Sequence, residues 1–408
     1  MQNILFLAHR IPFPPNRGDK IRAHHLLRKV AELANVHVGC FAENDEDRAG
    51  EAWLAEIASS HRLVDRKKPL VLAGIEAVLS RKPVSLTAFH SNALDEWVRK
   101  AIDEHAIDTI FVFSGQMGQY VPEDFHGRVV IDLCDVDSAK FEGYAANGER
   151  VWLNSREGSL LASEEERLGG RADATVLISQ NEARLFQSRL RHPTNVDVHV
   201  IGNGIDSEFF GGRDDLHRSN MEASDGPRFV FTGQMNYRPN EQAALFVIQQ
   251  VLPRIRKELP NAEFHVVGRN PTARLLECDG KDGVTITGEV PDVRPYLADA
   301  HCVLAPLQIA RGVQNKVLEA MAMRCAVLLT PEAATGIDAE DGRDWRIVSH
   351  DAAGMANAAV ELAQAANARI DMGESAREFI LRKHAWGSML KPLEQLLSGQ
   401  EDDVRNAA

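Results

Sequence analysis

The segment from Arg311 to Ala322 combines a glycine, charged side chains and a predicted helix start in an order that suits a bound phosphate. A strand predicted at Cys302–Leu307 runs into a loop, and a helix begins near Gln314. The first turn of a helix presents unpaired backbone N–H groups and a partial positive charge, which attract anions. Gly312 lets the backbone approach a ligand closely, and Lys316 adds a cation in the first turn. The segment therefore predicts a phosphate site.

Glu319 follows Lys316 by one helical turn, so its carboxylate is placed to accept hydrogen bonds from the vicinal hydroxyls of a ribose. A nucleotide would then set its phosphates at the helix start and its ribose at this carboxylate. The structural alternative is that Lys316 and Glu319 form an i,i+3 ion pair on the helix surface. The spacing alone supports both interpretations equally.

Charge also follows predicted strands in the first half of the chain. Pro14–Arg22 comes after the first predicted strand and contains Arg17, Gly18 and Lys20. Glycine allows close backbone approach, and the two cations suit phosphates. The alternative is a proline-rich loop whose basic residues are solvated, and without further information this is the favoured interpretation.

The run Ile131–Ser138 ends another predicted strand with three carboxylates. Acidic clusters at strand ends suggest a metal site or a general base, and Asp135 or Asp137 is a candidate contact for a bound ligand. Capping of the next helix by Asp137 or Ser138 explains the same residues about as well. Ser114 begins a further strand-end loop and is another candidate contact for a bound ligand.

Several common catalytic motifs are missing. The chain has fifteen histidines without HxxH or HExxH spacing, and five scattered cysteines without CxxC spacing, so no zinc site is predicted. GxSxG, P-loop and GxGxxG motifs are absent as well. These absences argue against acyl hydrolases, P-loop kinases and ordinary dinucleotide-binding enzymes.

The elements that would position these residues alternate between short apolar runs and helical patterns. Most apolar runs are continuous, which is typical of parallel strands buried on both faces, so the repetition predicts an α/β fold. Helices are expected at His24–Leu33, Glu241–Glu258, Lys316–Met323 and Met389–Leu397. Strands are expected at Ile4–Ala8, Val36–Ala42, Thr109–Phe113, Val129–Leu133, Thr175–Ser179, Val198–Ile201, Arg228–Thr232, Glu263–Val267, Val284–Thr287, Cys302–Ala305, Ala326–Leu329 and Arg346–Val348.

This number of strands exceeds one eight-stranded barrel. Gly211–Gly226 is polar, lacks an apolar period and follows the turn signal Asn203-Gly204, so we interpret it as a linker. Each half would then be a doubly wound sheet, and two such sheets facing each other make a cleft. The expected domains are residues 1–205 and 206–385, with a helix at about 386–408 packing back on the first domain.

The composition is that of a folded chain. It has 408 residues, 44% apolar and 26% charged, and a net charge of −13. A general nucleic-acid-binding protein usually has a basic domain, so this balance argues against that class. No apolar run reaches the roughly 20 residues that span a bilayer, and no basic leader is present. We therefore expect a cytoplasmic protein that is able to touch the inner face of a membrane.

The stretch His61–Lys82 places basic clusters on both sides of an apolar helix in an otherwise acidic chain. One interpretation is that this helix rests on an anionic membrane surface. The alternative is a helix packed in the core with solvated ends, and from the sequence we favour this alternative. The basic residues are Arg66, Lys67, Lys68, Arg81 and Lys82.

The segment Arg311–Glu319 resembles the E-x7-E region of family-4 retaining glycosyltransferases. In that family the second Glu binds the nucleotide ribose, and the first contacts the donor sugar. Glu319 matches the second position, whereas Arg311 replaces the first. An Arg cannot accept hydrogen bonds. The resemblance therefore implies that Arg311 pairs with the donor diphosphate or with a carboxylate on the sugar.

Other segments resemble the same family, in the same order. Gly233–Asn240 is similar to the loop after the first donor-domain strand, with Gln234 in place of the usual Arg, and Val266–Asn270 and Thr287–Val290 are similar to the loops that flank the base. Ile201–Asp206 is similar to the signature at the domain junction, and Pro14–Arg22 to the glycine loop over the donor phosphates. The resemblance implies catalytic roles for Arg238, Lys316, Arg311 and Asp137; donor contacts by Gly18, Arg17, Gly233, Gln234, Gly268, Arg269, Val290, Gly312, Val313, Asn315 and Glu319; and acceptor contacts by Ser114 and Asp135.

The resemblance covers the whole chain and implies a GT-B fold with two Rossmann-like domains. Asp132–Tyr144, Met235–Asn240 and Arg311–Met323 are most similar to sugar transferases of exopolysaccharide and PEP-CTERM/exosortase systems. It implies transfer of a sugar from a nucleotide-diphosphate sugar to a glycan or lipid-linked acceptor, with retention at the anomeric carbon. His9 and His90 are candidates for a His that some relatives place near the reacting carbon.

Asp135-Val-Asp137 also matches the DxD manganese motif of the other glycosyltransferase fold. Members of the GT-B class generally need no metal, so the resemblance implies neither a metal nor another cofactor. Two rival functions remain open. A GT-B-fold nucleotide-sugar epimerase would need acid/base residues such as these two carboxylates, and the replacement at Arg311 is compatible with a non-catalytic relative that binds nucleotide or glycan.

Overall fold

The computed structural model describes residues 2–211, 225–310 and 312–399. The chain divides into two compact units, Met1–Asn203 with Met389–Ala408 and Gly204–Ser388. The linker predicted at Gly211–Gly226 lies almost entirely outside the described residues, and so does Arg311.

The first unit is built on a parallel sheet of seven strands in the order β3-β2-β1-β4-β5-β6-β7. The strand order reverses between β1 and β4, which makes the carboxyl ends of these strands the expected place for a ligand. The strands are β1 (Asn3–Ala8), β2 (Asn35–Ala42), β3 (Ser60–Asp65), β4 (Thr109–Phe113), β5 (Arg128–Cys134), β6 (Ala174–Leu177) and β7 (Val198–Val200).

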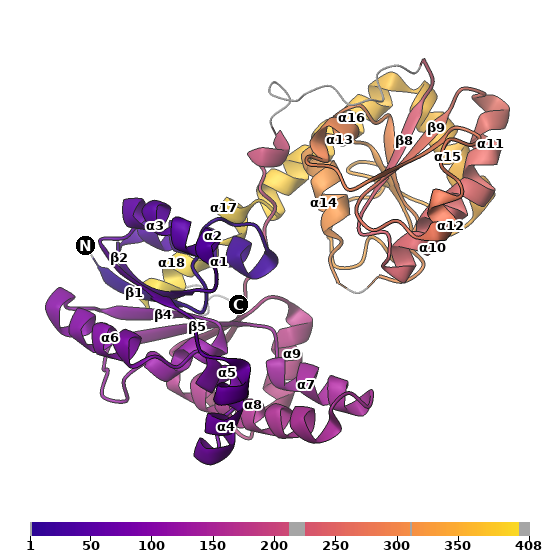
Figure 1. Cartoon of the computed structure of the whole chain (residues 1–408). Coiled ribbons are helices and arrows are strands. Elements are labelled where there is room, and N and C mark those ends of the chain that lie inside the picture. Colours follow the sequence, from indigo (N-terminus) through magenta and orange to yellow (C-terminus); the bar gives the residue numbers. More distant parts are fainter. Residues whose placement is uncertain (1, 212–224, 311, 400–408) are drawn as a thin grey trace. The chain divides into compact units, whose positions relative to one another are not determined.

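Helices cover both faces of this sheet (Figure 1). The helices α1, α3 and α18 lie on one side of the sheet, and α6, α8 and α9 lie on the other. The helices of this unit are α1 (Gly18–Leu33), α2 (Asp45–Ala49), α3 (Glu51–Ile57), α4 (Leu70–Ser80), α5 (Val84–Ala88), α6 (Asn92–His105), α7 (Asp137–Ala146), α8 (Val151–Arg171), α9 (Gln180–Arg189) and α18 (Lys391–Ser398).

The second unit has a parallel sheet of six strands in the order β10-β9-β8-β11-β12-β13, so its switch point lies between β8 and β11. Its strands are β8 (Arg228–Thr232), β9 (Glu263–Val267), β10 (Val284–Gly288), β11 (Cys302–Ala305), β12 (Val327–Leu329) and β13 (Arg346–Ile347). Its helices are α10 (Arg238–Phe246), α11 (Leu252–Glu258), α12 (Ala273–Leu276), α13 (Arg294–Ala298), α14 (Asn315–Ala322), α15 (Ala352–Gln364) and α16 (Ala366–Lys383), and α17 (Trp386–Met389) lies at the boundary of the units.

The helix predicted at Glu241–Glu258 is interrupted by a π-helical turn, Val247–Val251, between α10 and α11. Pro253 explains this turn, because proline has no N–H to donate and its ring crowds the carbonyl one turn earlier. The helix therefore widens by one residue just before the proline.

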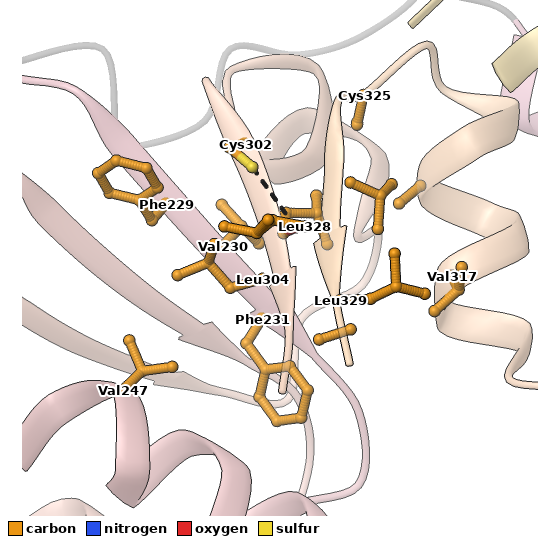
Figure 2. Packing of buried hydrophobic residues seen from close by; sticks show 14 of the residues in the cluster. Phe229, Val230, Phe231, Val247, Cys302, Leu304, Val317, Cys325, Leu328 and Leu329 are labelled. Atoms are coloured by element: carbon orange, nitrogen blue, oxygen red, sulfur yellow. Dashed lines mark hydrogen bonds between the residues drawn. The ribbon is translucent and has the colours of Figure 1, made fainter. Parts of the chain in front are cut away.

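The core of the second unit explains why its strands have continuous apolar sequences. Figure 2 shows Phe229 and Phe231 of β8, Leu304 of β11 and Leu329 of β12 packed together, with Val317 of α14 against the sheet. All five side chains are fully buried. Because Val317 is held in this core, the first turn of α14 has a fixed place beside the ends of β8 and β11.

The twelve predicted strands are all present, within two residues of their expected bounds. The prediction missed β3, an edge strand in which only Leu63 is buried. Another expectation was wrong: the apolar helix within His61–Lys82, which is α4, is not packed in the core. Two alanines, Ala73 and Ala77, are its only buried residues.

Candidate functional site

The switch point of the second unit brings together two predicted site residues, Gly233 and Lys316. The loop after β8 begins at Gly233, and the loop after β11 leads into α14, whose second residue is Lys316. The Lys316 ammonium donates a hydrogen bond to Oδ1 of Asn240 and lies 4.8 Å from the centroid of the Phe231 ring. A Cβ atom added to Gly233 would lie 3.2 Å from the Lys316 Nζ atom, so the cation sits directly against this backbone.

The glycines of this region hold neighbouring loops against each other. Gly233 has φ 152° and Gly268 has φ 151°, which an L side chain rarely adopts. A Cβ atom on Gly268 would lie 1.8 Å from the carbonyl oxygen of Gly233. The Gly268 N–H in turn donates to the carbonyl of Gly288 at 3.0 Å. The loops after β8, β9 and β10 therefore form one assembly. The close contact with the Gly233 carbonyl explains why residue 268 is a glycine. Gly312, at φ 71°, has open space where a Cβ would stand.

Two cations stand at the rim of this assembly without a carboxylate partner among the described residues. Arg269 donates to Oε1 of Gln234 at 3.0 Å, and the Gln234 carbonyl accepts from Nδ2 of Asn240 at 2.9 Å. Arg238, the first residue of α10, is exposed and makes no side-chain hydrogen bond or ion pair within the described part of the chain. Both guanidinium groups are therefore available to an anion.

The start of α14 carries a cation in its first turn, Lys316, and a carboxylate one turn later, Glu319, and the two do not pair with each other. Within the described residues Lys316 and Glu319 form no ion pair, so the surface-pair interpretation is wrong. Burial lowers the pKa of Lys316 from 10.5 to about 8, and the Glu319 charge acts in the opposite direction. Burial raises the pKa of Glu319, whereas the Lys316 charge lowers it. The Glu319 carboxylate has no hydrogen-bond partner in the described part of the structure, which leaves its oxygens free for a ligand.

The remaining donor-side candidates lie on the same loops. Asn315 and Val313 are exposed at the start of α14 and just before it. Val290 follows β10 and is half-buried against the core of the second unit. Arg311 lies outside the described residues.

At the switch point of the first unit, a charged network surrounds the end of β1. The Asp19 carboxylate accepts from His9 Nε2 at 3.2 Å, from Arg10 Nη1 at 2.7 Å and from Arg17 Nε at 2.8 Å. Hydrogen bonding to His9 and the neighbouring charges hold the pKa of Asp19 well below its usual range despite burial. Arg17 is therefore engaged by Asp19, whereas nothing lies within 4 Å of a Cβ added to Gly18.

Lys20 does not belong to a phosphate loop as expected, because α1 already begins at Gly18 and turns the side chain inward. Its Nζ donates to Asp47 Oδ1 at 2.8 Å in a buried pair. Arg22 is buried in the same way: its Nη2 lies 2.7 Å from Asp132 Oδ2, and it also donates to the carbonyl of Ile201 at 2.8 Å. These ionic groups support the fold.

The acidic run after β5 divides into structural and accessible groups. Val136, and neither Asp137 nor Ser138, is the N-cap of α7, so the capping interpretation is wrong. The Ser138 N–H and hydroxyl instead donate to Glu165 at 2.9 and 2.5 Å, and burial raises the pKa of Glu165 to about 7. Burial also raises the pKa values of Asp135 and Asp137. Asp137 is close enough to His9 for their charges to interact.

Ser114 follows β4, the neighbour of β1, in a left-handed conformation with φ 78°. Such strain in a non-glycine residue is often found at functional sites. Its hydroxyl hydrogen-bonds to Oε1 of Gln116. His9 is buried nearby at the same edge of the sheet, with no hydrogen-bond partner for its Nδ1 atom among the described residues, whereas His90 is exposed between α5 and α6.

Comparison with known families identifies the second unit. Residues 226–365 match the family model described as Glycosyl transferases group 1. The match covers about a third of the chain, so the second unit is similar to glycosyltransferases of group 1. No curated protein sequence matches the chain significantly.

Solved structures share the fold of the whole chain. HepE from Anabaena, solved with UDP and glucose, is 14% identical with a TM-score of 0.60, and the match covers 98% of this chain and 100% of HepE. Sucrose-phosphate synthase from Thermosynechococcus elongatus is 16% identical with a TM-score of 0.59, over 98% and 99% of the chains. WaaG, described as involved in lipopolysaccharide biosynthesis, is 15% identical with a TM-score of 0.56, over 97% and 100%. Together with the two parallel sheets, these matches establish the GT-B fold.

The region that matches this family model contains all donor-side candidates except Gly18 and Arg17, which lie in the first unit. Sequence reasoning missed Asp19 and Arg10, although charged residues directly after a first strand and in the next helical turn are a usable signal. In the described parts of both units, no group of three or more His, Cys, Asp or Glu side chains is arranged to hold a metal ion. No helix among the described residues is long and apolar enough to cross a membrane.

Proposed function

We propose that this protein transfers a sugar from a nucleotide-diphosphate sugar to a glycan or lipid-linked acceptor, with retention at the anomeric carbon, in the synthesis of exopolysaccharide or another cell-surface glycan. The observation that carries the proposal is the arrangement at the start of α14. There Lys316 lies against Gly233 and Asn240, and the carboxylate of Glu319 is left without a protein partner in the described structure.

The donor diphosphate binds at the N-terminus of α14, where backbone N–H groups, the helix dipole and Lys316 all favour negative charge. Arg238 supplies a second cation from the first turn of α10. Glu319 accepts hydrogen bonds from the ribose, and the loops at Arg269 and Val290 flank the base. HepE, which has the same fold, was solved with UDP-glucose, and this supports a uridine nucleotide as the first donor to test.

The protein stabilises the leaving group, because negative charge develops on the diphosphate as the glycosidic bond of the donor breaks. Lys316, with a pKa of about 8, is mostly protonated at neutral pH, and a bound diphosphate raises its pKa further. The departing diphosphate takes the acceptor proton, so the reaction needs no protein nucleophile. Arg311 contacts either the diphosphate or a carboxylate on the donor sugar.

The acceptor is assigned to residues 1–205 and the donor to residues 206–385. Ser114, Asp135 and Asp137 follow the strands next to the switch point of the first unit, where ligands of doubly wound sheets bind. The described role of WaaG in lipopolysaccharide biosynthesis supports a surface glycan as the product class.

Thermal-shift measurements with a panel of nucleoside diphosphates, followed by turnover assays on each hit, test this proposal. One nucleotide should raise the melting temperature, and its sugar conjugate should lose the sugar to an acceptor. No stabilisation by any nucleotide would refute the donor site, and binding without turnover would favour a non-catalytic relative.

A nucleotide-sugar epimerase is the second candidate, because Asp135 and Asp137 both follow β5 and burial raises the pKa of each, a direction that suits acid/base catalysis. Incubating the nucleotide sugar without acceptor separates the two functions. An epimerase forms a new isomer, whereas a transferase gives at most slow hydrolysis.

A further inference from the structure

The helix α4 exposes a continuous apolar surface to solvent. Six of its eleven residues are large apolar side chains that are between 55% and 82% exposed. Patches of this kind on a soluble protein mark sites of interaction. The six are Leu70, Val71, Leu72, Ile75, Val78 and Leu79.

The arrangement of side chains around α4 is the reverse of that in a core-facing helix. At about 100° per residue, Val71, Ile75 and Leu79 form the centre of a stripe that covers roughly a third of the circumference when Leu72 and Val78 at its sides are included. The two fully buried alanines, Ala73 and Ala77, lie on the opposite side. The small residues thus seat the helix on the protein, and the large ones point away.

Hydrogen bonds fix α4 in this orientation. The Thr87 hydroxyl donates to the carbonyl of Ala73 at 2.8 Å, and Arg156 of α8 donates to the carbonyl of Ala77 at 2.6 Å. Lys68 bridges the carbonyl of Thr87 at 2.9 Å and the Glu76 carboxylate at 2.7 Å. Figure 1 shows α4 beyond α5 and α8, on the side away from the sheet. The apolar stripe is therefore displayed by a supported helix.

Cations lie at both ends of the stripe, although the chain as a whole carries a net charge of −13. The Lys67 side chain, just before α4, is 84% exposed and forms a surface ion pair with Asp65 at 3.0 Å. Arg81 and Lys82, just after it, are exposed and have no carboxylate partner among the described residues. Trp152 of α8 is 71% exposed and lies one turn before Arg156, which contacts the C-terminal end of α4. An aromatic ring of this kind suits the boundary between water and lipid.

We propose that α4 and Trp152 form a docking surface for an anionic phospholipid bilayer, with the apolar stripe in the interface and Lys67, Arg81 and Lys82 on the lipid headgroups. An anionic bilayer complements the stripe and both cationic ends at once.

A second copy of the chain fits this surface poorly. Antiparallel packing of two α4 helices would bring Lys67 of one copy against Arg81 and Lys82 of the other. Parallel packing would place like ends together, so both arrangements oppose like charges. The proposal does not depend on the sugar-transfer reaction, but it would bring the first unit to a membrane that presents a lipid-linked acceptor.

Liposome flotation tests the charged part of the surface. The full chain should float with vesicles of equal parts phosphatidylglycerol and phosphatidylcholine, and not with phosphatidylcholine alone. Each basic residue near an anionic surface strengthens binding about fivefold, so K67Q/R81Q/K82Q should weaken binding on the order of a hundredfold. The control K257Q/K281Q/K383Q removes three exposed cations of the second unit and should leave binding within about twofold.

A second pair of variants tests the apolar stripe. V71Q/I75Q/L79Q should weaken flotation by about tenfold or more, because it replaces exposed apolar groups that enter the interface. Its control, L276Q/I370Q/L381Q, changes side chains of similar exposure in the second unit and should bind as the wild type does. All six positions are exposed, and thermal melting checks that each variant is folded.

Three results would overturn the proposal: no flotation of the wild type with anionic vesicles, equal binding to both vesicle types, or equal binding by the stripe variant and its control. A dimeric wild type that V71Q/I75Q/L79Q makes monomeric in sedimentation would also overturn it, by assigning the face to a second copy. Nucleotide thermal shifts are measured on the same variants. A failure of flotation with intact nucleotide binding therefore refutes the membrane surface and leaves the donor site standing.

Discussion

Replacing Glu319 with Ala tests the ribose contact in isolation from the fold. Among the described residues the Glu319 carboxylate has no hydrogen-bond partner, so its removal breaks no bond in the protein. Burial raises its pKa, which means that ionisation costs more in the folded chain than in the unfolded one. This destabilisation of the folded chain is fully present at any pH above the raised pKa, because the Glu319 carboxyl is then ionised in both the folded and the unfolded state. E319A should therefore leave the stability of the unliganded protein unchanged or raise it slightly. The same change should weaken the binding of the nucleotide.

The expected loss follows from the type of hydrogen bond. A hydrogen bond to a charged acceptor contributes about 1.5–3 kcal/mol, which corresponds to a factor of roughly 10 to 150 in affinity. Titration calorimetry with UDP and 2′-deoxy-UDP separates this bond from other contacts. The wild type should bind UDP at least about tenfold more tightly than the deoxy compound, and E319A should bind both with equal, weak affinity.

Two results would refute this reasoning. If E319A still binds UDP more tightly than 2′-deoxy-UDP, a group other than Glu319 makes the hydrogen bond to the ribose 2′-hydroxyl. If E319A loses stability by more than about 1 kcal/mol, the carboxylate has a structural role that its surroundings do not indicate. The matched control is E332A, which removes an exposed carboxylate elsewhere in the same unit and should leave both affinities unchanged.

Three further outcomes are expected. Because Lys316 has a pKa of about 8 in place of 10.5, the calorimetric affinity for UDP should fall as the pH rises from 8 towards 10.5, and K316Q should bind weakly without this pH dependence. In urea unfolding, G268A should cost on the order of 3 kcal/mol, since its Cβ would lie 1.8 Å from a carbonyl oxygen, whereas G280A, with φ 72° and open space, should cost only about 1 kcal/mol. D132N should cost roughly 3–5 kcal/mol by leaving Arg22 buried without its counter-ion, which a shift of the urea midpoint would reveal.

The fold could be predicted because its strands are buried on both faces. The predicted bounds of β8 and β11 agree with the structure, since every residue after the first in β8, and every residue of β11, is buried. The edge strand β3 was not predicted, because it pairs on one side only and has a single buried residue. Its sequence therefore lacks the apolar run that the other strands share. Burial on both faces is thus the property that the sequence pattern reports.

The local part of the site could also be predicted, and the long-range part could not. The start of α14 follows from a strand, a glycine and an apolar helix pattern that are adjacent in sequence. The bond from Lys316 to Asn240 spans 76 residues, and the contact of Gly268 with Gly233 joins two strand ends. These pairs depend on the strand order β9-β8-β11, which no local pattern determines.

The helix α4 shows why apolar periodicity alone cannot say which way a helix faces. From the sequence alone, a core-packed helix with solvated ends is the favoured interpretation of this stretch. The side chains differ in size, however: the alanines at 73 and 77 form one face, and the large aliphatic residues form the opposite one. A core-facing helix directs its largest apolar groups inward, because they gain most from burial. When the small residues of an apolar helix face inward and cations lie at both of its ends, a lipid interface explains the apolar residues better than a core does. The helix α4 meets both conditions, because Ala73 and Ala77 face inward and Lys67, Arg81 and Lys82 lie at its ends.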